Sequence, residues 1–236
     1  MTSYSNTKAL VVGAGKSGLA AARYLRARGA AVVISDSKPQ PAQTDFPQTT
    51  QNETDSDGFD LIIQSPGVPL ELPIFERARA RGVRIIGELE LAADELRGHI
   101  FGITGANGKT TTTALLGHIS KHANRPTLVG GNIGVPVTDL VAQSTPDSTV
   151  VLELSSFQLE TIETFKAHIS LVLNITPDHL DRHHTMERYI DAKARLTRAS
   201  DGPRRPHPVA GTPAAAHAAG APAPRPRARA GPCAAS

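Results

Sequence analysis

The chain has 236 residues, and 39% of them are hydrophobic, which is enough for the packed core of one large domain or two small ones. Its formal net charge of +3 comes from residues 201–236, where five arginines accompany one acidic residue, so the rest of the chain gives no support to nucleic-acid binding. Its single cysteine, Cys233, excludes a disulfide framework and a thiolate metal site. No apolar run approaches the ~18 residues of a membrane span, so we expect a cytoplasmic monomer without a membrane segment.

The first part of the chain alternates short β-rich runs with helical patterns. Strands are expected in "KALVV", "AAVVIS", "FDLIIQS" and "VRIIG", and helices in "KSGLAAARYLRARG", "PIFERARARG" and "ELELAADEL". The polar stretch 36–58 is expected to be a loop or a weak helix. This order predicts an α/β fold in which a mostly parallel sheet has helices on both faces, here as a Rossmann-like domain over residues 1–97.

A second alternating series begins near residue 98. Strands are expected in "HIFGIT", "STVVLEL" and "ISLVLNIT", the last two as fully buried central strands, and helices in "KTTTTALLGHISKHA" and "TMERYIDAKARL". Residues 98–199 are therefore predicted to form a second domain with a parallel sheet. Residues 200–236 hold eight of the eighteen prolines and one large aliphatic residue, Val209, so we expect a disordered tail there.

The first glycine loop is G-x-G-x-x-G, formed by Gly13, Gly15 and Gly18 between a strand and a helix. Asp36 ends the next strand, about twenty residues further on, which is the spacing of a dinucleotide-binding fingerprint. Such a loop lets backbone amides approach a phosphate, and the carboxylate can accept a hydrogen bond from a ribose hydroxyl. The motif indicates a nucleotide-type ligand but does not distinguish NAD from another diphosphate, and a tight turn that needs glycine only for packing is the alternative.

The second glycine loop, T-G-A-N-G-K-T-T, lies between a strand and a helix. Ile103 stands where the general G-x-x-x-x-G-K-[ST] motif has its first glycine, so that motif is incomplete. A triphosphate fits here, with Lys109 reaching the outer phosphates and Thr110 or Thr111 offering a hydroxyl to Mg²⁺. The alternative is a glycine- and threonine-rich turn with a solvated lysine.

Acidic and histidine side chains follow the later strands. Glu153 ends one predicted strand, and Asp178, His179 and Asp181 follow another, at the edge of the sheet where α/β proteins place ligand groups. Beside a phosphate loop they favour Mg²⁺ ligation, although His179 and His183 also have a spacing that zinc ligands use. By pattern alone, Lys193 is a solvated lysine.

The ordered set of motifs resembles the ATP-dependent Mur ligases of bacterial peptidoglycan synthesis. T-G-A-N-G-K-T-T, G-G-N-I-G, "LELSSFQLE" and D-H-L-D-R-H followed by A-K carry the resemblance, and "GAGKSG", "SPGV" and "GELEL" narrow it to members that add D-glutamate to UDP-N-acetylmuramoyl-L-alanine. The resemblance covers about residues 7–198, and it implies that residues 98–199 are an incomplete P-loop-type central ATPase domain. It implies an acid–D-amino-acid ligase that uses ATP and Mg²⁺ and forms its amide bond through an acyl phosphate.

The resemblance also assigns roles to residues of this chain. It implies that the first loop holds the UDP substrate rather than NAD, through Gly13, Gly15, Lys16, Ser17, Gly18, Asp36, Ser37, Ser65, Pro66, Gly67, Asn132 and Ser155. It implies that ATP is held by Gly105, Ala106, Asn107, Gly108, Lys109, Thr110, Thr111 and Thr112. Lys109, Glu153, His179 and Lys193 are the implied catalytic residues, and the implied metal-site residues are Thr110, Glu153, His179 and a carbamylated Lys193.

The sequence departs from the family after residue 198. Family members are longer and have a third domain that carries the D-glutamate site and closes over ATP, whereas a proline-, alanine- and arginine-rich segment stands here. We expect a C-terminally truncated product of a frameshifted GC-rich gene that is inactive in amide formation. Two other functions stay open: an NAD(P)-dependent oxidoreductase, from the first loop alone, and a non-enzymatic P-loop regulator whose basic tail binds nucleic acid.

Overall fold

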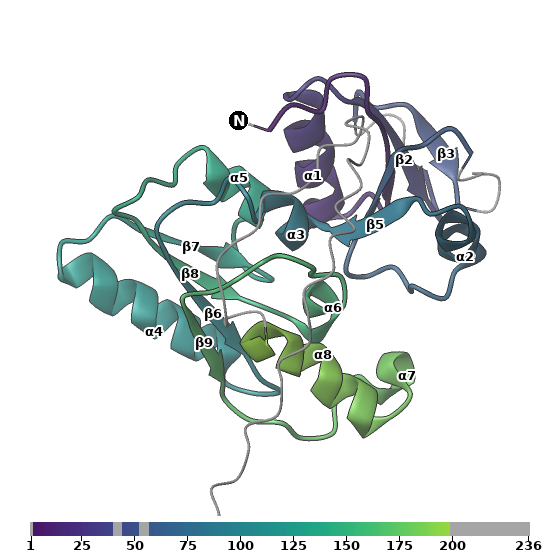
Figure 1. Cartoon of the computed structure of the whole chain (residues 1–236). Coiled ribbons are helices and arrows are strands. Elements are labelled where there is room, and N and C mark those ends of the chain that lie inside the picture. The colour runs from purple at the N-terminus through teal and green to yellow at the C-terminus, as the bar shows by residue number, and fades with distance from the viewer. Residues whose placement is uncertain (1, 40–43, 52–56, 199–236) are drawn as a thin grey trace, which may run out of the picture.

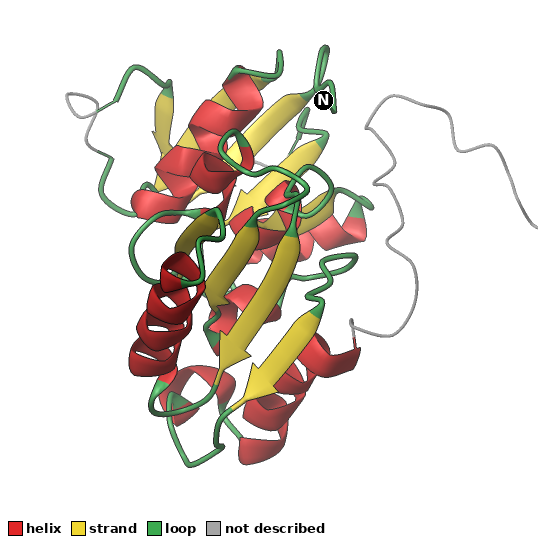
Figure 2. Ribbon diagram, turned by 90° about the vertical axis from the view of Figure 1, so that its left-hand side faces the viewer, coloured by secondary structure: helices red, strands yellow, loops and turns green. Residues whose placement is uncertain are grey.

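The computed structural model describes residues 2–39, 44–51 and 57–198, which form two parallel sheets with helices packed on them (Figures 1 and 2). The first sheet has the strand order β3-β2-β1-β4-β5. Its strands are β1 (Lys8–Val12), β2 (Ala31–Asp36), β3 (Gln48–Thr50), β4 (Leu61–Gln64) and β5 (Arg84–Gly87). All four pairings are parallel, which confirms the Rossmann-like arrangement predicted from the alternating pattern.

Both faces of the first sheet are buried. Along β1, Ala9 and Val11 belong to one hydrophobic cluster, shared with α1 (Lys16–Arg26), whereas Leu10 and Val12 belong to another, shared with α2 (Pro73–Ala80). Successive side chains of a strand point to opposite faces, so a continuous apolar run is what a sheet covered on both sides requires.

The second sheet has the strand order β7-β8-β6-β9, and all of its pairings are parallel. Its strands are β6 (His99–Thr104), β7 (Thr127–Gly131), β8 (Thr149–Glu153) and β9 (Ile169–Val172). The long helices α4 (Lys109–His122) and α8 (Met186–Arg198) lie on opposite sides of it (Figure 2). The shorter helices are α3 (Glu88–Ala92), α5 (Val137–Val141), α6 (Ser156–Leu159) and α7 (Leu180–His183).

Four expectations need correction or lie outside the described residues. The stretch 36–58 contains the short strand β3, which pairs with β2, rather than only a loop or weak helix. The strand β8 is central and buried, but β9 is an edge strand of the described sheet and is partly exposed. The helix expected in "ELELAADEL" ends at Ala92. The predicted tail, residues 200–236, lies outside the described residues.

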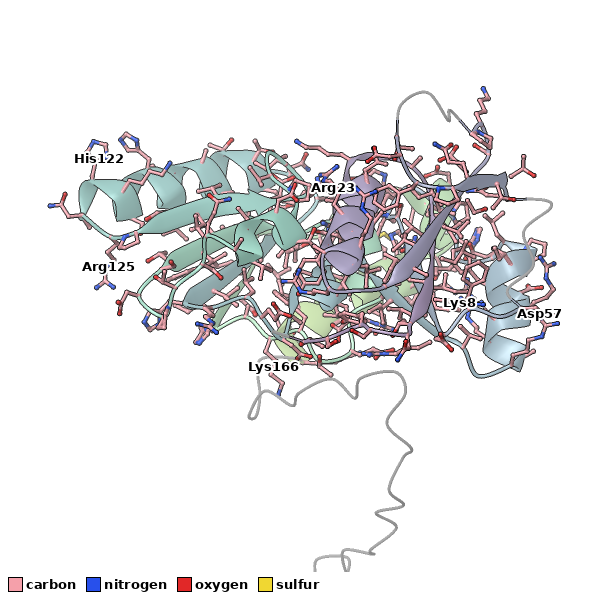
Figure 3. The ribbon with its side chains drawn as sticks, turned by 90° about the horizontal axis from the view of Figure 1, so that it is seen from above. Lys8, Arg23, Asp57, His122, Arg125 and Lys166 are labelled. Carbon is pink, nitrogen blue, oxygen red and sulfur yellow. The ribbon has the colours of Figure 1, made fainter. Side chains whose placement is uncertain are left out.

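The two sheets share one hydrophobic core. A single cluster contains Val11 of the first sheet and Val150 of the second, and α1, α3 and α5 pack against one another between them (Figure 1). Arg23 of α1 lies at this junction and pairs with Asp139 of α5 at 3.4 Å (Figure 3). The boundary predicted at residues 97 and 98 stays a prediction. No helix in the described part of the chain is long and apolar enough to cross a membrane.

A buried carboxyl group joins α3 to α5. Glu88 is 2% exposed, and its Oε1 accepts hydrogen bonds from the backbone amide of Thr138 at 2.6 Å and from the hydroxyl of Thr138 at 2.8 Å. Its Oε2 has no hydrogen-bond partner. Burial raises the pKa of Glu88 to about 7, the two hydrogen bonds from Thr138 oppose that rise, and the charge of Asp139 adds to it.

We predict that this contact makes stability depend on pH. Because the pKa of Glu88 is higher in the folded chain than its ordinary value of 4.5, the folded state binds more protons, and stability falls as pH rises from about 4.5 to about 7. Glu88→Gln should remove this fall, which amounts to about 3 kcal/mol. Urea unfolding at pH 5 and pH 7.5 measures it. Glu76→Gln, on the exposed side of α2, should behave as wild type, and a pH dependence unchanged in Glu88→Gln would contradict the prediction.

Candidate functional site

A cavity of about 580 Å³ opens where the carboxyl ends of β1 and β4 meet the second sheet. The strand β1 lies between β2 and β4, and the order in which the chain adds strands to the sheet reverses here. Open α/β sheets bind their ligands at such a switch point, outside the carboxyl ends of the strands. The cavity is lined by Gly13, Gly15, Lys16, Ser17, Asp36, Ser37, Gln51, Ser65, Pro66, Gly67, Val68, Pro69, Leu72, Asn132 and Gln158.

The glycines of the first loop have different physical roles. Gly13 has φ +102°, which favours glycine, and a Cβ on Gly18 would lie 2.0 Å from the carbonyl oxygen of Gly13, so these two serve the turn and its packing. A Cβ on Gly15 would meet nothing within 4 Å, and the same is true of Gly67 on the facing turn. Both line the cavity, and the open space beside their backbones is room for a ligand.

Asp36 holds the loop itself. Its Oδ2 accepts from the backbone amide of Ala14 at 2.7 Å and its Oδ1 accepts from that of Lys38 at 2.9 Å. Burial raises the pKa of Asp36, but these backbone hydrogen bonds outweigh burial and the pKa is lowered, so the carboxylate stays charged. In the dinucleotide-binding interpretation this carboxylate accepts a hydrogen bond from a ribose hydroxyl. Here its Oδ2 already binds the glycine loop, and its Oδ1 binds the turn that follows β2.

Most residues predicted for the UDP substrate line this cavity, and the exceptions are Gly18 and Ser155. Ser155 contacts Gln158, a residue of the cavity, through a capping box of α6. The Ser155 hydroxyl accepts from the backbone amide of Gln158, and the Gln158 side-chain oxygen accepts from the backbone amide of Ser155. Gln158, which does line the cavity, was missed. The S-x-x-Q spacing of "SSFQ" is a capping-box signature and could have identified the pair.

The second glycine loop leaves an uncapped helix terminus. Gly108 precedes α4 with φ +81°, no side chain caps the helix, and no acidic residue stands in its first turn. The positive end of the helix dipole and the free amide groups are therefore available to an anion. Lys109 folds back over the loop, and its Nζ donates to the carbonyl oxygens of Gly105 at 2.9 Å and Ala106 at 3.0 Å.

Glu153 links the second glycine loop to a residue of the first cavity. This carboxylate is 2% exposed, and its Oε2 accepts from the hydroxyl of Thr110 at 2.8 Å while its Oε1 accepts from the side-chain amide of Asn132 at 2.9 Å. Thr110 belongs to the second loop, and Asn132 lines the first cavity. The Glu153 carboxylate and the Thr110 hydroxyl are hard oxygen donors, and these fit Mg²⁺.

Lys193 is buried, so the solvated lysine expected from pattern alone is wrong. Its side chain is 2% exposed, its Nζ donates to the Gly105 carbonyl oxygen at 2.9 Å, and the ammonium lies 4.6 Å from the centre of the Tyr189 ring. Burial, with a smaller contribution from the charge of Lys109, lowers the pKa of Lys193 to about 8. Some of this amine is therefore neutral near pH 7.

His179 lies apart from these contacts. Its side chain is half exposed, its backbone has φ 52°, and its ring centre is 5.0 Å from that of Phe157. His183 is buried and engaged by the Ser156 hydroxyl at 2.8 Å and the Glu160 carboxylate at 3.2 Å. Within residues 2–39, 44–51 and 57–198, no three His, Cys, Asp or Glu side chains are grouped to hold a metal ion, so the zinc alternative gains no support.

Comparison with known proteins identifies the family. Residues 103–203 match the Mur ligase middle domain, and residues 7–87 match the Mur ligase MurD-like N-terminal domain. The chain belongs to the Mur ligase family. The family resemblance, the two parallel sheets and the order of motifs expected from the sequence are thereby confirmed.

Two relatives of this Mur ligase chain are named UDP-N-acetylmuramoylalanine–D-glutamate ligase. The protein of Solibacter usitatus is 55% identical over 194 residues, covering 80% of this chain and 44% of the relative. That of Koribacter versatilis is 50% identical over 200 residues, covering 80% of this chain and 44% of the relative. The chain thus spans less than half the length of these relatives.

A solved structure shares the fold. The UDP-N-acetylmuramate:L-alanyl-gamma-D-glutamyl-meso-diaminopimelate ligase of Neisseria meningitides aligns with a TM-score of 0.52 and 18% identity. The alignment covers 84% of this chain and 69% of that protein. At this identity the similarity shows that the fold is the same.

The different roles of Gly15 and Gly18 can be separated by substitution. Gly18→Ala should destabilise the chain by more than about 2 kcal/mol, because a methyl group 2.0 Å from a backbone oxygen forces α1 away from β1. Gly15→Ala should change stability by less than about 1 kcal/mol, because its φ of −68° suits alanine and its surroundings are open. Thermal unfolding of both variants measures this, and equal losses would contradict the assignment.

Proposed function

We propose that this chain supplies the UDP-substrate and ATP sites of a ligase that adds D-glutamate to UDP-N-acetylmuramoyl-L-alanine. The observation that carries the proposal is the link from Asn132 through Glu153 to Thr110, which joins a cavity built on one glycine loop to a second glycine loop. An enzyme that transfers phosphate from a nucleotide to a bound substrate needs two such sites with a shared wall. The names of the relatives supply the identity of the substrate.

In this proposal the first cavity takes the UDP substrate. The open backbone at Gly15 and Gly67 admits the diphosphate from both sides, and the ammonium group of Lys16 supplies positive charge. Lys16 donates to the carbonyl oxygen of Gly134 in the second domain, so the cation lies between the two domains. Asn132 lines the cavity and donates to Glu153, so it orients the substrate carboxylate toward the second loop, and Gln158 lines the same cavity.

The second loop takes ATP. Its phosphates occupy the uncapped terminus of α4, and Lys109 turns from the loop carbonyl oxygens to the outer phosphates. Thr110 and Glu153 would hold Mg²⁺, and the family resemblance adds His179 and a carbamylated Lys193 to the residues that would hold it. Bound there, Mg²⁺ would neutralise the charge of the transferring phosphate. The lowered pKa of Lys193 supports carbamylation, because only the neutral amine reacts with carbon dioxide.

The reaction has two steps. A carboxylate oxygen of the UDP substrate attacks the γ-phosphorus of ATP, and ADP leaves with the electrons of the broken P–O bond. The amine of D-glutamate then attacks the acyl carbon, and phosphate leaves as the amide forms and the amine loses a proton. The residues of this chain hold the substrate carboxylate near the γ-phosphate.

We further propose that the reaction takes place in the cytoplasm. The enzyme acts as a monomer and binds no nucleic acid.

The oxidoreductase alternative explains less of the structure. It depends on the first loop and on Asp36 as a ribose acceptor, but that carboxylate is engaged by the amides of Ala14 and Lys38. It also leaves Lys109 and the buried Lys193 without a role. Titration with NADH by calorimetry separates the two functions, because heat of binding with NADH and none with the UDP substrate would favour the oxidoreductase.

A chimera tests the proposal. Residues 7–198 replace the corresponding part of the Solibacter usitatus relative, which is 55% identical over the matched region. The chimera should release ADP and form UDP-N-acetylmuramoyl-L-alanyl-D-glutamate from UDP-N-acetylmuramoyl-L-alanine, ATP and D-glutamate. UDP-N-acetylmuramate, which lacks the alanine, should react at least about tenfold more slowly. A folded chimera without product, or with no preference between the two substrates, would contradict the proposal.

Lys109→Ala should separate the two sites. ATP binding should weaken by at least about tenfold, because Lys109 is the cation of the second loop, while binding of UDP-N-acetylmuramoyl-L-alanine should change by less than about twofold. Calorimetry on the variant and the wild type measures both dissociation constants, and Lys121→Ala, near the far end of α4, is the control. If Lys109→Ala weakened both ligands equally while the fold was preserved, the assignment of two loops to two ligands would be wrong.

A further inference from the structure

Arg182 reaches from the second domain into the wall of the first cavity. It lies on α7, three residues after His179, and its Nη2 donates to the carbonyl oxygen of Val68 at 2.8 Å. Val68 ends the Ser65–Val68 turn after β4, which lines the cavity. The side chain of Arg182 is 13% exposed, so its charge is largely withdrawn from water and depends on these partners.

The guanidinium of Arg182 also pairs with the Glu160 carboxylate at 3.7 Å, and a further contact leads to His179. The guanidinium lies 5.0 Å from the centre of the Phe157 ring, and the ring of His179 lies 5.0 Å from the same ring. Phe157 also stacks on His183 with ring centres 5.2 Å apart. One aromatic ring therefore contacts His179, Arg182 and His183, and the segment that carries them is packed as a unit against α6.

The backbone of this segment is held in an unusual conformation. His179 has φ 52° and His184 has φ 66°, so residues with left-handed backbones stand at both ends of α7. Histidine adopts this conformation more often than most residues, but two such positions around one turn persist only when side-chain contacts fix them. The contacts that fix α7 are those of Arg182 to Val68 and Glu160 and of His183 to Ser156 and Glu160.

We infer that Arg182 is a positioning residue that couples the Ser65–Val68 turn of the UDP cavity to His179. A substrate that settles against this turn fixes the Val68 carbonyl, and Arg182 then fixes α7 and the adjacent His179 relative to the substrate. Arg182 need not touch the substrate for this. The inference rests on the proposed function, because it needs a ligand on the Ser65–Val68 turn.

The experiment compares three variants of the 236-residue chain. Arg182→Met keeps the apolar contact with Phe157 but removes the guanidinium, and Arg182→Lys keeps a positive charge and one donor. Arg188→Met, an exposed arginine two residues into α8, is the matched control. Calorimetry gives the dissociation constants for UDP-N-acetylmuramoyl-L-alanine and for ATP with Mg²⁺, and NMR follows the imidazole signal of His179, assigned with His179→Gln.

In the wild type and in Arg188→Met, the UDP substrate should shift the His179 signal. In Arg182→Met the substrate should bind about tenfold more weakly, the His179 shift at saturation should be lost, and ATP binding should change by less than about twofold. Arg182→Lys should restore part of the shift. If the role of Arg182 were purely structural, its loss would weaken the binding of both ligands. The substrate would then still shift the His179 signal in the fraction of protein that binds it.

Two outcomes overturn the inference, and they are distinguishable. If the wild type binds the UDP substrate and both Arg182 variants keep its affinity and the full His179 shift, the coupling is wrong and the proposed function stands. If the wild type shows no binding of UDP-N-acetylmuramoyl-L-alanine, the proposed function of the cavity fails and the inference fails with it. Should Arg182→Met not fold, a complete wild-type response in Arg182→Lys would by itself contradict the role of the guanidinium fork.

Discussion

The hydrogen bonds of the buried Glu153 carboxylate are the constraint on which the site depends. A carboxylate that is 2% exposed needs hydrogen-bond donors from the protein. Here the side chains of Asn132 and Thr110 each donate a hydrogen bond to one of its oxygens. Because Asn132 comes from the loop after β7 and Thr110 from the start of α4, the carboxylate fixes three strand ends relative to one another. The substrate cavity and the phosphate loop are therefore parts of one arrangement.

The two domains meet through a core and through polar contacts that cross it. The shared hydrophobic cluster brings α1, α3 and α5 together, and the Glu88–Thr138 contact fixes α3 against α5. Around the cavity, Lys16 reaches Gly134 in one direction and Arg182 reaches Val68 in the other. Each contact joins a side chain of one domain to a backbone carbonyl oxygen of the other.

The buried Lys193 shows how the environment changes the chemistry of a side chain. Lys109 and Lys193 both donate to the carbonyl oxygen of Gly105, one from the start of α4 and one from α8. Burial and the proximity of the second cation disfavour the charged form of Lys193. The same side chain on an exposed helix face would keep its ordinary pKa, so the position on α8 decides its reactivity.

The sequence by itself determined the α/β class, the two glycine loops and the parallel strands, because apolar periodicity and glycine spacing are local properties of the chain. It did not place β3, which pairs with β2 through a polar stretch without a strand pattern, or the exposed edge position of β9. Only the tertiary structure decided that Lys193 is buried, that Asp36 accepts a hydrogen bond from Ala14 of the first glycine loop, and that Gln158 lines the cavity. Burial and hydrogen-bond partners come from segments distant in the sequence, and a single sequence carries no local signal for them.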